Sequence, residues 1–270
     1  MSHNLLKGKK GIIFGALDEK SMAWRTALRC HEEGAQIVLS NAPVALRMGE
    51  INKLSEQIDA PVFAADVTSM DDLKKLFEGA GAHFNGGVDF ILHSVGMSLN
   101  VRKGRGYTDL DYAFNQKTLD ISAMSLHRVL KTAWDMDIIN EWGSVVALSY
   151  IAAQRVFPDY SEMADAKALL ESVARSFGYH YALKKKVRIN TISQSPTKTT
   201  AGSGVKGFDG FIGYAEKMSP LGNATADQCA DYCIAMFSDL TKMVTMQNLF
   251  HDGGFSLTGV TAAVISQMEK

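Results

Sequence analysis

Short apolar runs alternate with longer stretches of helical periodicity along almost the whole chain. Several of the runs, such as Ile12-Ile13-Phe14, are continuously apolar, which is typical of parallel strands buried on both faces of a sheet. They predict seven strands, at residues 11–15, 36–40, 62–66, 88–94, 144–149, 187–193 and 247–251. The stretches between them predict helices at residues 21–33, 45–58, 71–82, 109–137, 160–183 and 225–239. Asp71 and Thr225 suit helix N-caps, and Gly34 is placed to end the first helix.

This order of elements predicts one α/β domain over residues 1–270. Seven strands joined by crossover helices form a doubly wound, Rossmann-type domain with a parallel sheet flanked by helices. Residues 197–214 depart from the pattern, because they carry five glycines directly after a strand. Ligands in this architecture bind outside the carboxyl ends of the strands. We therefore expect residues 197–214 to be a mobile lid over the substrate, with a fixed surface loop as the alternative.

Composition narrows the class of protein. The formal charge of −1 on 270 residues predicts neither a nucleic-acid partner nor a membrane surface, and no apolar run reaches the ~18 residues of a membrane span. The chain starts without the charged-then-apolar layout of a signal peptide. Its three cysteines, Cys30, Cys229 and Cys233, are an odd number with neither redox-pair nor zinc spacing, so we expect packed thiols and no metal. These features predict a cytoplasmic protein.

Candidate cofactor contacts follow the first, third and fourth strands. Gly15 lets the backbone approach a pyrophosphate and Ser21 can cap the next helix, although the G-x-G-x-x-G fingerprint is absent. Asp66 could accept from an adenine amino group, or it could cap a turn. Gly96 permits close backbone approach at the sheet edge. His93 closes a buried strand, and we expect it to be packed and hydrogen-bonded rather than catalytic.

Two tyrosines and a lysine carry the candidate chemistry. Tyr150 ends a strand, and Tyr160 and Lys167 are seven residues apart. If Asp159 caps a helix, both would project from one helical face and could reach one ligand. A phenol donates well to a developing oxyanion, and an ammonium nearby strengthens that field. The alternative is a pair that only shares a face. Tyr181 begins a Y-x3-K sequence but lies too close to the next strand, so we expect a structural role for it.

These motifs together resemble the bacterial NADH-dependent enoyl-acyl-carrier-protein reductases, a branch of the short-chain dehydrogenase superfamily. The similarity runs from about Lys7 to Gly259. It rests on a glycine followed after six residues by Ser-Met-Ala (from Gly15), on H-S-x-G (93–96), on S-Y-x9-Y-x6-K (149–167), on R-I-N-x-I-S (188–193) and on D-G-G-F-S (252–256). The Y-x6-K spacing separates this family from its ketone-reducing relatives.

The resemblance implies an NADH-dependent reduction of trans-2-enoyl thioesters carried on acyl carrier protein, by a homotetramer. It implies that Tyr160 stabilises the enolate, that Lys167 holds the nicotinamide ribose, and that Tyr150 lies near the substrate carbonyl. The implied cofactor contacts are Gly15, Ser21, Met22, Asp66, Val67, Val95, Gly96, Lys167, Thr197 and Thr199. The implied substrate contacts are Ser98, Tyr150, Met163 and Phe208.

The chain departs from the family pattern in two places. Residues 193–197 read S-Q-S-P-T where the family often has S-A-G-P-I. Residues 41–43 read N-A-P and lack the acidic residue that specifies the 2′-hydroxyl in other Rossmann enzymes. Asn41 and Ala42 also offer no positive charge to a 2′-phosphate, so NADH is expected over NADPH, with Arg47 as the counter-argument. The alternative functions are a ketone or alcohol reductase of the same fold and a non-catalytic dinucleotide sensor.

Overall fold

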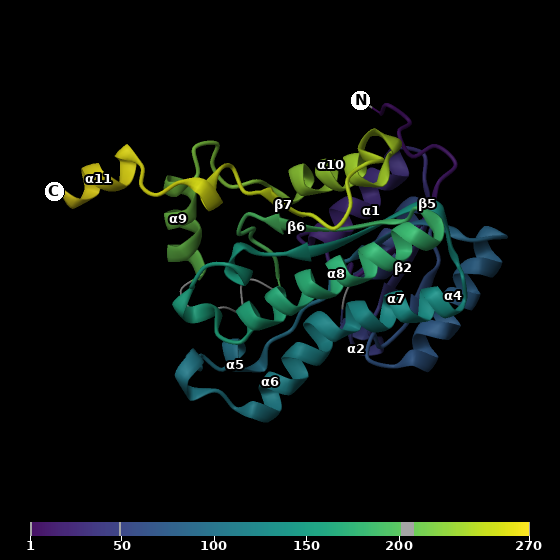
Figure 1. Ribbon diagram of the computed structural model, residues 1–270, viewed down its shortest axis with the longest axis horizontal. Coiled ribbons are helices and arrows are strands. Elements are labelled where there is room, and N and C mark those ends of the chain that lie inside the picture. The colour runs from purple at the N-terminus through teal and green to yellow at the C-terminus, as the bar shows by residue number, and fades with distance from the viewer. Residues whose placement is uncertain (1, 49, 201–207, 270) are drawn as a thin grey trace.

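A seven-stranded parallel sheet forms the centre of the computed structural model, which describes residues 2–48, 50–200 and 208–269 (Figure 1). The strand order is β3-β2-β1-β4-β5-β6-β7, so the chain winds outward in both directions from β1 and β4. This confirms the predicted doubly wound α/β fold. The strands are β1 Lys10–Phe14, β2 Gln36–Asn41, β3 Val62–Ala64, β4 Val88–His93, β5 Ile139–Ser149, β6 Arg188–Gln194 and β7 Asn248–His251.

Helices cover both faces of this sheet, with α1 and α10 on one face and α4, α7 and α8 on the other (Figure 1). The helices are α1 Met22–Glu32, α2 Pro43–Met48, α3 Ile51–Ile58, α4 Met70–Phe84, α5 Leu99–Arg102, α6 Tyr112–Leu119, α7 Ser125–Asp135, α8 Met163–Lys185, α9 Phe208–Met218, α10 Ala226–Phe237 and α11 Ala262–Met268. A π-helical turn, Asp120–Met124, joins α6 to α7, and 3-10 turns include Ile151–Ala153 and Pro158–Tyr160.

The apolar strands supply two cores, one under each layer of helices. Successive strand residues point to opposite faces, so Ile91 packs with α4 and α7 while Phe90 and Leu92 pack with α1 and α10. All three side chains are fully buried. The continuous apolar runs of the sequence are therefore explained by burial on both faces.

Helix ends match the predictions only in part. Thr225 forms a complete capping box with Gln228, and Gly34 follows α1 at φ +88°, so both predictions are confirmed. The predicted cap at Asp71 is wrong, because the Ser69 hydroxyl accepts from the Asp72 amide and Asp71 lies in the first turn of α4. The predicted single helices at 45–58 and 109–137 are each broken, into α2 and α3 and around the π-helical turn.

The glycine-rich segment is only partly a loop. The sequence predicts a loop through residue 214, and this is wrong from Phe208 onward, because 208–218 form α9. The buried side chains of Ala215 and Met218 give this helix an apolar face, which offsets the cost of its glycines. Residues 201–207, the centre of the expected lid, lie outside the described residues.

None of the helices in the described ranges has the length and apolar character needed to cross a membrane.

Candidate active site

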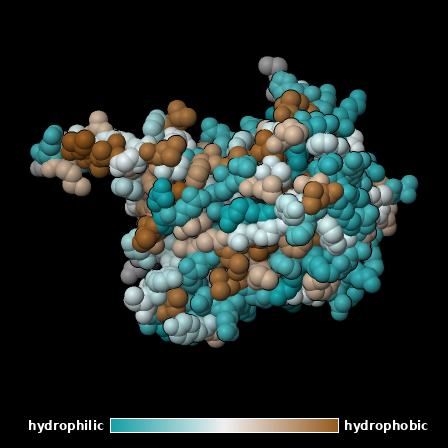
Figure 2. All heavy atoms as spheres, in the orientation of Figure 1, coloured by the Kyte–Doolittle hydropathy of each residue, from teal (hydrophilic) through white to brown (hydrophobic). Residues whose placement is uncertain are grey.

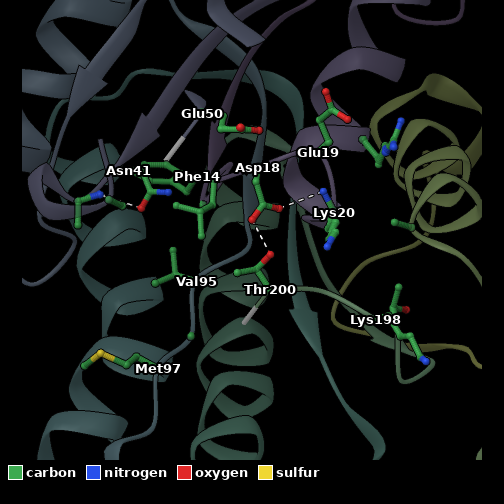
Figure 3. Close-up of a pocket in the computed structure, with 18 of the residues that line it drawn as sticks. Phe14, Asp18, Glu19, Lys20, Asn41, Glu50, Val95, Met97, Lys198 and Thr200 are labelled. Atoms are coloured by element: carbon green, nitrogen blue, oxygen red, sulfur yellow. Dashed lines mark hydrogen bonds between the residues drawn. The ribbon is translucent and has the colours of Figure 1, made fainter. Parts of the chain in front are cut away.

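A cavity of ≈ 1530 Å³ follows the carboxyl ends of the central strands. Its walls come from the segments after β1, β2, β3, β4 and β6 and from the start of α10 (Figure 3). Strand ends gather there because all the strands are parallel, as the fold predicts. Six of the expected cofactor residues border it: Gly15, Asp66, Val67, Val95, Gly96 and Thr197.

Gly15 has a geometry that only glycine satisfies. Its φ is +94°, and a Cβ at this position would meet the Ser94 carbonyl oxygen at 2.0 Å. The backbone turns there from β1 toward α1 while touching the end of β4. A side chain would separate these two strand ends.

Ser21 and Met22 do not border the cavity. The Ser21 hydroxyl accepts from the Trp24 amide at 3.2 Å and donates to the Asp18 carbonyl at 2.8 Å, so it caps α1. Met22 packs against the core beneath α1. Their part in a cofactor site is therefore to fix where α1 begins.

The end of the cavity after β2 is lined by Asn41, which the sequence analysis names, and by Glu50, which it does not. Asn41 donates to the Ala16 carbonyl and accepts from the Ala42 amide, both at 2.8 Å, so its side chain braces the loop after β1 (Figure 3). Glu50 borders this end and brings a carboxylate where an acidic residue after β2 was missing. No motif marks Glu50, which lies directly before α3, nine residues after Asn41.

A contact across the cavity joins two distant segments. The Thr200 hydroxyl donates to Asp18 at 2.5 Å, linking the segment after β6 to the loop after β1 (Figure 3). Thr197 donates to the Ser195 and Ala224 carbonyls. Thr199 does not border the cavity. The Thr200 contact could not be read from the sequence, since 182 residues separate its partners.

Tyr150 and Tyr160 face one another, with ring centroids 5.0 Å apart. Neither they nor Lys167 line the cavity itself, but α9 connects them to it, because Phe211 packs on Tyr150 and Ile212 lines the cavity. Tyr150 ends β5, is 8% exposed, and its hydroxyl has no hydrogen-bond partner among the described residues. Phe157, Phe211 and Phe255 complete an aromatic cluster around them. Burial raises the pKa of both phenols, and the nearby Tyr160 and Asp252 raise that of Tyr150 further. Both hydroxyls are therefore protonated donors.

The predicted shared helix face of Tyr160 and Lys167 is wrong. Tyr160 closes the 3-10 turn Pro158–Tyr160, and α8 begins only at Met163. The turn exists because Pro158 fixes its start and Ser161 takes a positive φ of 47° that no helix allows. Tyr160 therefore meets Tyr150 through the turn, and Lys167 lies separately on the first turns of α8.

Lys167 points back toward the end of β5. Its ammonium donates to the Leu148 carbonyl at 2.7 Å and the residue is only 8% exposed. Burial lowers the pKa of Lys167 to about 8, and the carboxylate of Glu171, one turn further along α8, opposes that shift. Glu171 is itself held by the Ser149 hydroxyl at 2.7 Å, and burial raises its pKa.

His93 and Tyr181 have the structural roles that the sequence predicts. His93 is fully buried, with Nε2 2.9 Å from the Ser125 hydroxyl, and burial lowers its pKa to about 3 with help from the Lys167 charge. It is therefore a neutral, packed histidine. Tyr181 donates to the Leu130 carbonyl at 2.8 Å inside the core. The Y-x3-K sequence that it begins lies far along α8 from Lys167.

The remaining expected substrate residues lie near the two tyrosines or outside the description. Ser98 caps α5, accepts from the Val101 amide at 3.0 Å and donates to Glu162 at 2.7 Å. Met163 lies against Gly96, where an added Cβ would meet its methyl at 2.9 Å. Phe208 begins α9, and its side chain lies outside the described part.

The family model described as enoyl-(acyl carrier protein) reductase matches residues 15–256, which is most of the chain and every residue that lines the cavity except Phe14. The chain belongs to this reductase family. A member from Neisseria meningitidis, "Enoyl-[acyl-carrier-protein] reductase [NADH] FabI", is 33% identical over 260 residues, 95% of this chain and 98% of that protein.

Solved structures of reductases in the family agree in fold over nearly the whole chain. A FabI–NADH complex from Alistipes finegoldii superposes with a TM-score of 0.96 and 60% identity, covering 97% of this chain and 92% of that one. The reductase from Aquifex aeolicus gives a TM-score of 0.88 at 30% identity, covering 95% and 100%. Both match the sheet and its flanking helices, so the family resemblance noted in the sequence is confirmed.

Proposed function

We propose that this reductase converts trans-2-enoyl thioesters carried on acyl carrier protein to saturated acyl thioesters, with NADH as reductant, in type II fatty acid biosynthesis. The family and the printed cofactor of its relatives support the reaction class. The observation that carries the proposal is the pair of protonated tyrosines, of which Tyr150 has a buried hydroxyl without a partner among the described residues. Helix α9 links this pair to the strand-edge cavity, because Phe211 packs on Tyr150 and the next residue, Ile212, lines the cavity.

The cavity fits an extended dinucleotide. It runs from Glu50 and Asn41 past Gly15 to Gly96 along the ends of the strands. The two glycines have no side chains that would narrow this path. When bound, NADH supplies the hydride that adds to the β-carbon of the enoyl group. Lys167 would hold the nicotinamide ribose through its buried ammonium, which donates a hydrogen bond to the Leu148 carbonyl in this structure. Gly15, Asp66, Val67, Val95, Gly96 and Thr197 would form the remaining contacts.

Negative charge develops on the thioester oxygen as the β-carbon is reduced. Tyr160 would donate to that oxygen, and Tyr150 would approach it from the end of β5. Both phenols are desolvated donors, so they stabilise the oxyanion more strongly than water would. A proton then adds to the α-carbon and completes the reduction. Ser98, Met163 and Phe208 would border the acyl chain.

Helix α9 would cover the acyl side of this site. Phe211 packs edge-on against both Phe157 and Tyr150, and Ile212 borders the cofactor cavity. One helix therefore spans both halves of the site. This helix would exclude water from the reacting atoms, which is the role expected of residues 197–214 as a lid.

The test is oxidation of NADH with crotonyl-CoA, measured beside acetoacetyl-CoA. Loss of NADH absorbance with crotonyl-CoA supports the proposal. Turnover of acetoacetyl-CoA alone would establish a ketone reductase, and NADH binding without turnover of either would establish a sensor. Each outcome separates one of the three functions that the sequence leaves open.

A homotetramer and a cytoplasmic location belong to the same proposal. Helix α11 projects away from the body of the molecule and carries exposed apolar residues, including Ile265 and Met268 (Figures 1 and 2). Neighbouring subunits would cover such a projection. The three cysteines are buried free thiols, which suits a reducing compartment. Light scattering on the purified protein would measure the assembly.

A further inference from the structure

A fully buried carboxylate, Glu162, lies two residues after Tyr160. One of its oxygens, Oε1, accepts hydrogen bonds from the Ser98 hydroxyl at 2.7 Å and the Thr118 hydroxyl at 2.8 Å. Burial alone would raise the pKa of this carboxyl, but the Ser98 and Thr118 hydroxyls, together with the Glu162 backbone and the Ser161 hydroxyl, outweigh burial and lower the pKa. Glu162 is therefore an ionised group inside the protein.

Across the described ranges, no ion pair includes Glu162, and its second oxygen has no hydrogen-bond partner there. An apolar residue of similar volume would fill such a site at lower cost. Folding stability alone therefore does not explain a carboxylate at this position, and we look for its role in the segments that it connects.

Glu162 joins three separate elements at the active site. Ser98 ends the loop after β4, Thr118 lies on α6, and Glu162 lies between the turn that carries Tyr160 and the start of α8. Between Tyr160 and Glu162, Ser161 holds φ 47° and ψ −139°, a conformation that L-residues rarely adopt. Ser161, directly after the Tyr160 turn, therefore has a strained backbone, and the residue after it, Glu162, anchors the turn through its carboxylate.

Glu162 is hydrogen-bonded to the loop of residues 95–98, which borders the cavity. Val95, Gly96 and Met97 all line that cavity. The Ser122 hydroxyl accepts from the Met97 amide at 2.9 Å and donates to the Met97 carbonyl at 3.0 Å, which pins the loop to the π-helical turn. Ser98 then ties the same loop to Glu162. Loop 95–98 and the Tyr160 turn are in this way held to one another through a single carboxylate.

We propose that Glu162 is a positioning residue that sets the separation between loop 95–98, against which the cofactor would lie, and the Tyr160 hydroxyl. It touches neither cofactor nor substrate, and it acts through Ser98 and the turn. The inference rests on the proposed function, because it assigns Tyr160 a place relative to the bound cofactor. Small displacements of a positioned donor are costly in rate.

Three variants at this position separate positioning from structure. Glu162→Val removes the acceptor, and we expect kcat with crotonyl-CoA to fall at least tenfold while the Kd for NADH changes less than threefold. Glu162→Gln keeps an acceptor oxygen of the same shape and should restore kcat to within threefold of wild type. In kcat, Ser98→Ala/Glu162→Val should be no slower than Glu162→Val alone, because both changes cut the same connection, whereas loss of a Ser98 contact to the acyl chain would raise KM.

Glu33→Val is the control for loss of a buried carboxylate. Glu33 is also fully buried; it accepts from the His3 and Leu5 amides, pairs with Arg29 at 3.1 Å, and holds the N-terminal segment far from the tyrosines along the chain. It should lower Tm and leave kcat unchanged. Full kcat in Glu162→Val, a Glu162→Gln variant as slow as Glu162→Val, or multiplicative losses in the double variant would each overturn the inference.

Failure of the proposed function would look different. In that case wild-type protein would not oxidise NADH with crotonyl-CoA, and no variant could be slower. In that case the hydrogen-bonded connection between Ser98 and Glu162 is tested by measuring the Tm of the NADH complex in each variant. Coupling between Ser98 and Glu162 in that Tm supports the connection, and additive shifts refute it.

Discussion

The buried ammonium of Lys167 predicts how NADH binding depends on pH. Its pKa lies at about 8 because the side chain is desolvated, which is well below the ordinary 10.5. If only the charged form holds the ribose, the competent fraction falls about tenfold between one unit below and one unit above that pKa. The apparent Kd for NADH should therefore rise about tenfold, or ~1.4 kcal/mol, over that range.

The measurement is a fluorescence titration of NADH into the protein at several pH values. Lys167→Ala should bind weakly at every pH and lose most of the dependence, while Lys184→Ala, on the exposed end of α8, should follow wild type. A wild-type Kd that stays flat through this range, or a Lys167→Ala variant with the wild-type dependence, would refute the role given to Lys167.

A pH-dependent loss of folding stability cannot produce the same change in the Kd for NADH. The pKa of Lys167 is depressed in the folded state, so between about pH 8 and 10.5 the unfolded chain binds more protons than the folded one. Stability from this group therefore increases as pH rises through that window and is least below it. NADH binding changes in the opposite direction, since it needs the ammonium. Circular dichroism over the same pH range checks that the fold persists.

Three further substitutions test the rest of the site. Tyr160→Phe should lower kcat roughly a hundredfold with the Kd for NADH unchanged, since one oxyanion donor is lost; equal rates in stopped-flow turnover would contradict its role. Gly15→Ala should weaken NADH binding at least tenfold in calorimetry, because the added Cβ would meet the Ser94 carbonyl at 2.0 Å; wild-type affinity would show that the two strand ends separate freely. Phe211→Ala should raise the KM for crotonyl-CoA severalfold more than Phe211→Leu does, because α9 loses its contact with Tyr150; an unchanged KM would remove α9 from the acyl site.

Local patterns in the sequence determined the sheet and the family. Continuous apolar runs predict strands buried on both faces, and all seven strands are present; six have both ends within two residues of the prediction, and β5 begins five residues earlier, at Ile139. Thr225 could be recognised as a cap because a capping box needs only residues three positions apart. His93 was predicted to be packed from its place at the end of a buried strand. The family followed from the Y-x6-K spacing, which is a property of sequence alone.

Tertiary structure decided how the site is assembled. Spacing places Tyr160 on the helix of Lys167, but Pro158 and the positive φ of Ser161 move it into a turn, where its neighbour is Tyr150. Glu162 and Glu50 carry no motif, because their roles depend on partners or surfaces brought together by the fold. A sequence records which residues alternate along one element, whereas contacts between elements depend on strand order and on where each turn ends. The elements of this reductase were therefore readable from the chain, and the hydrogen bonds that join its active-site turns were not.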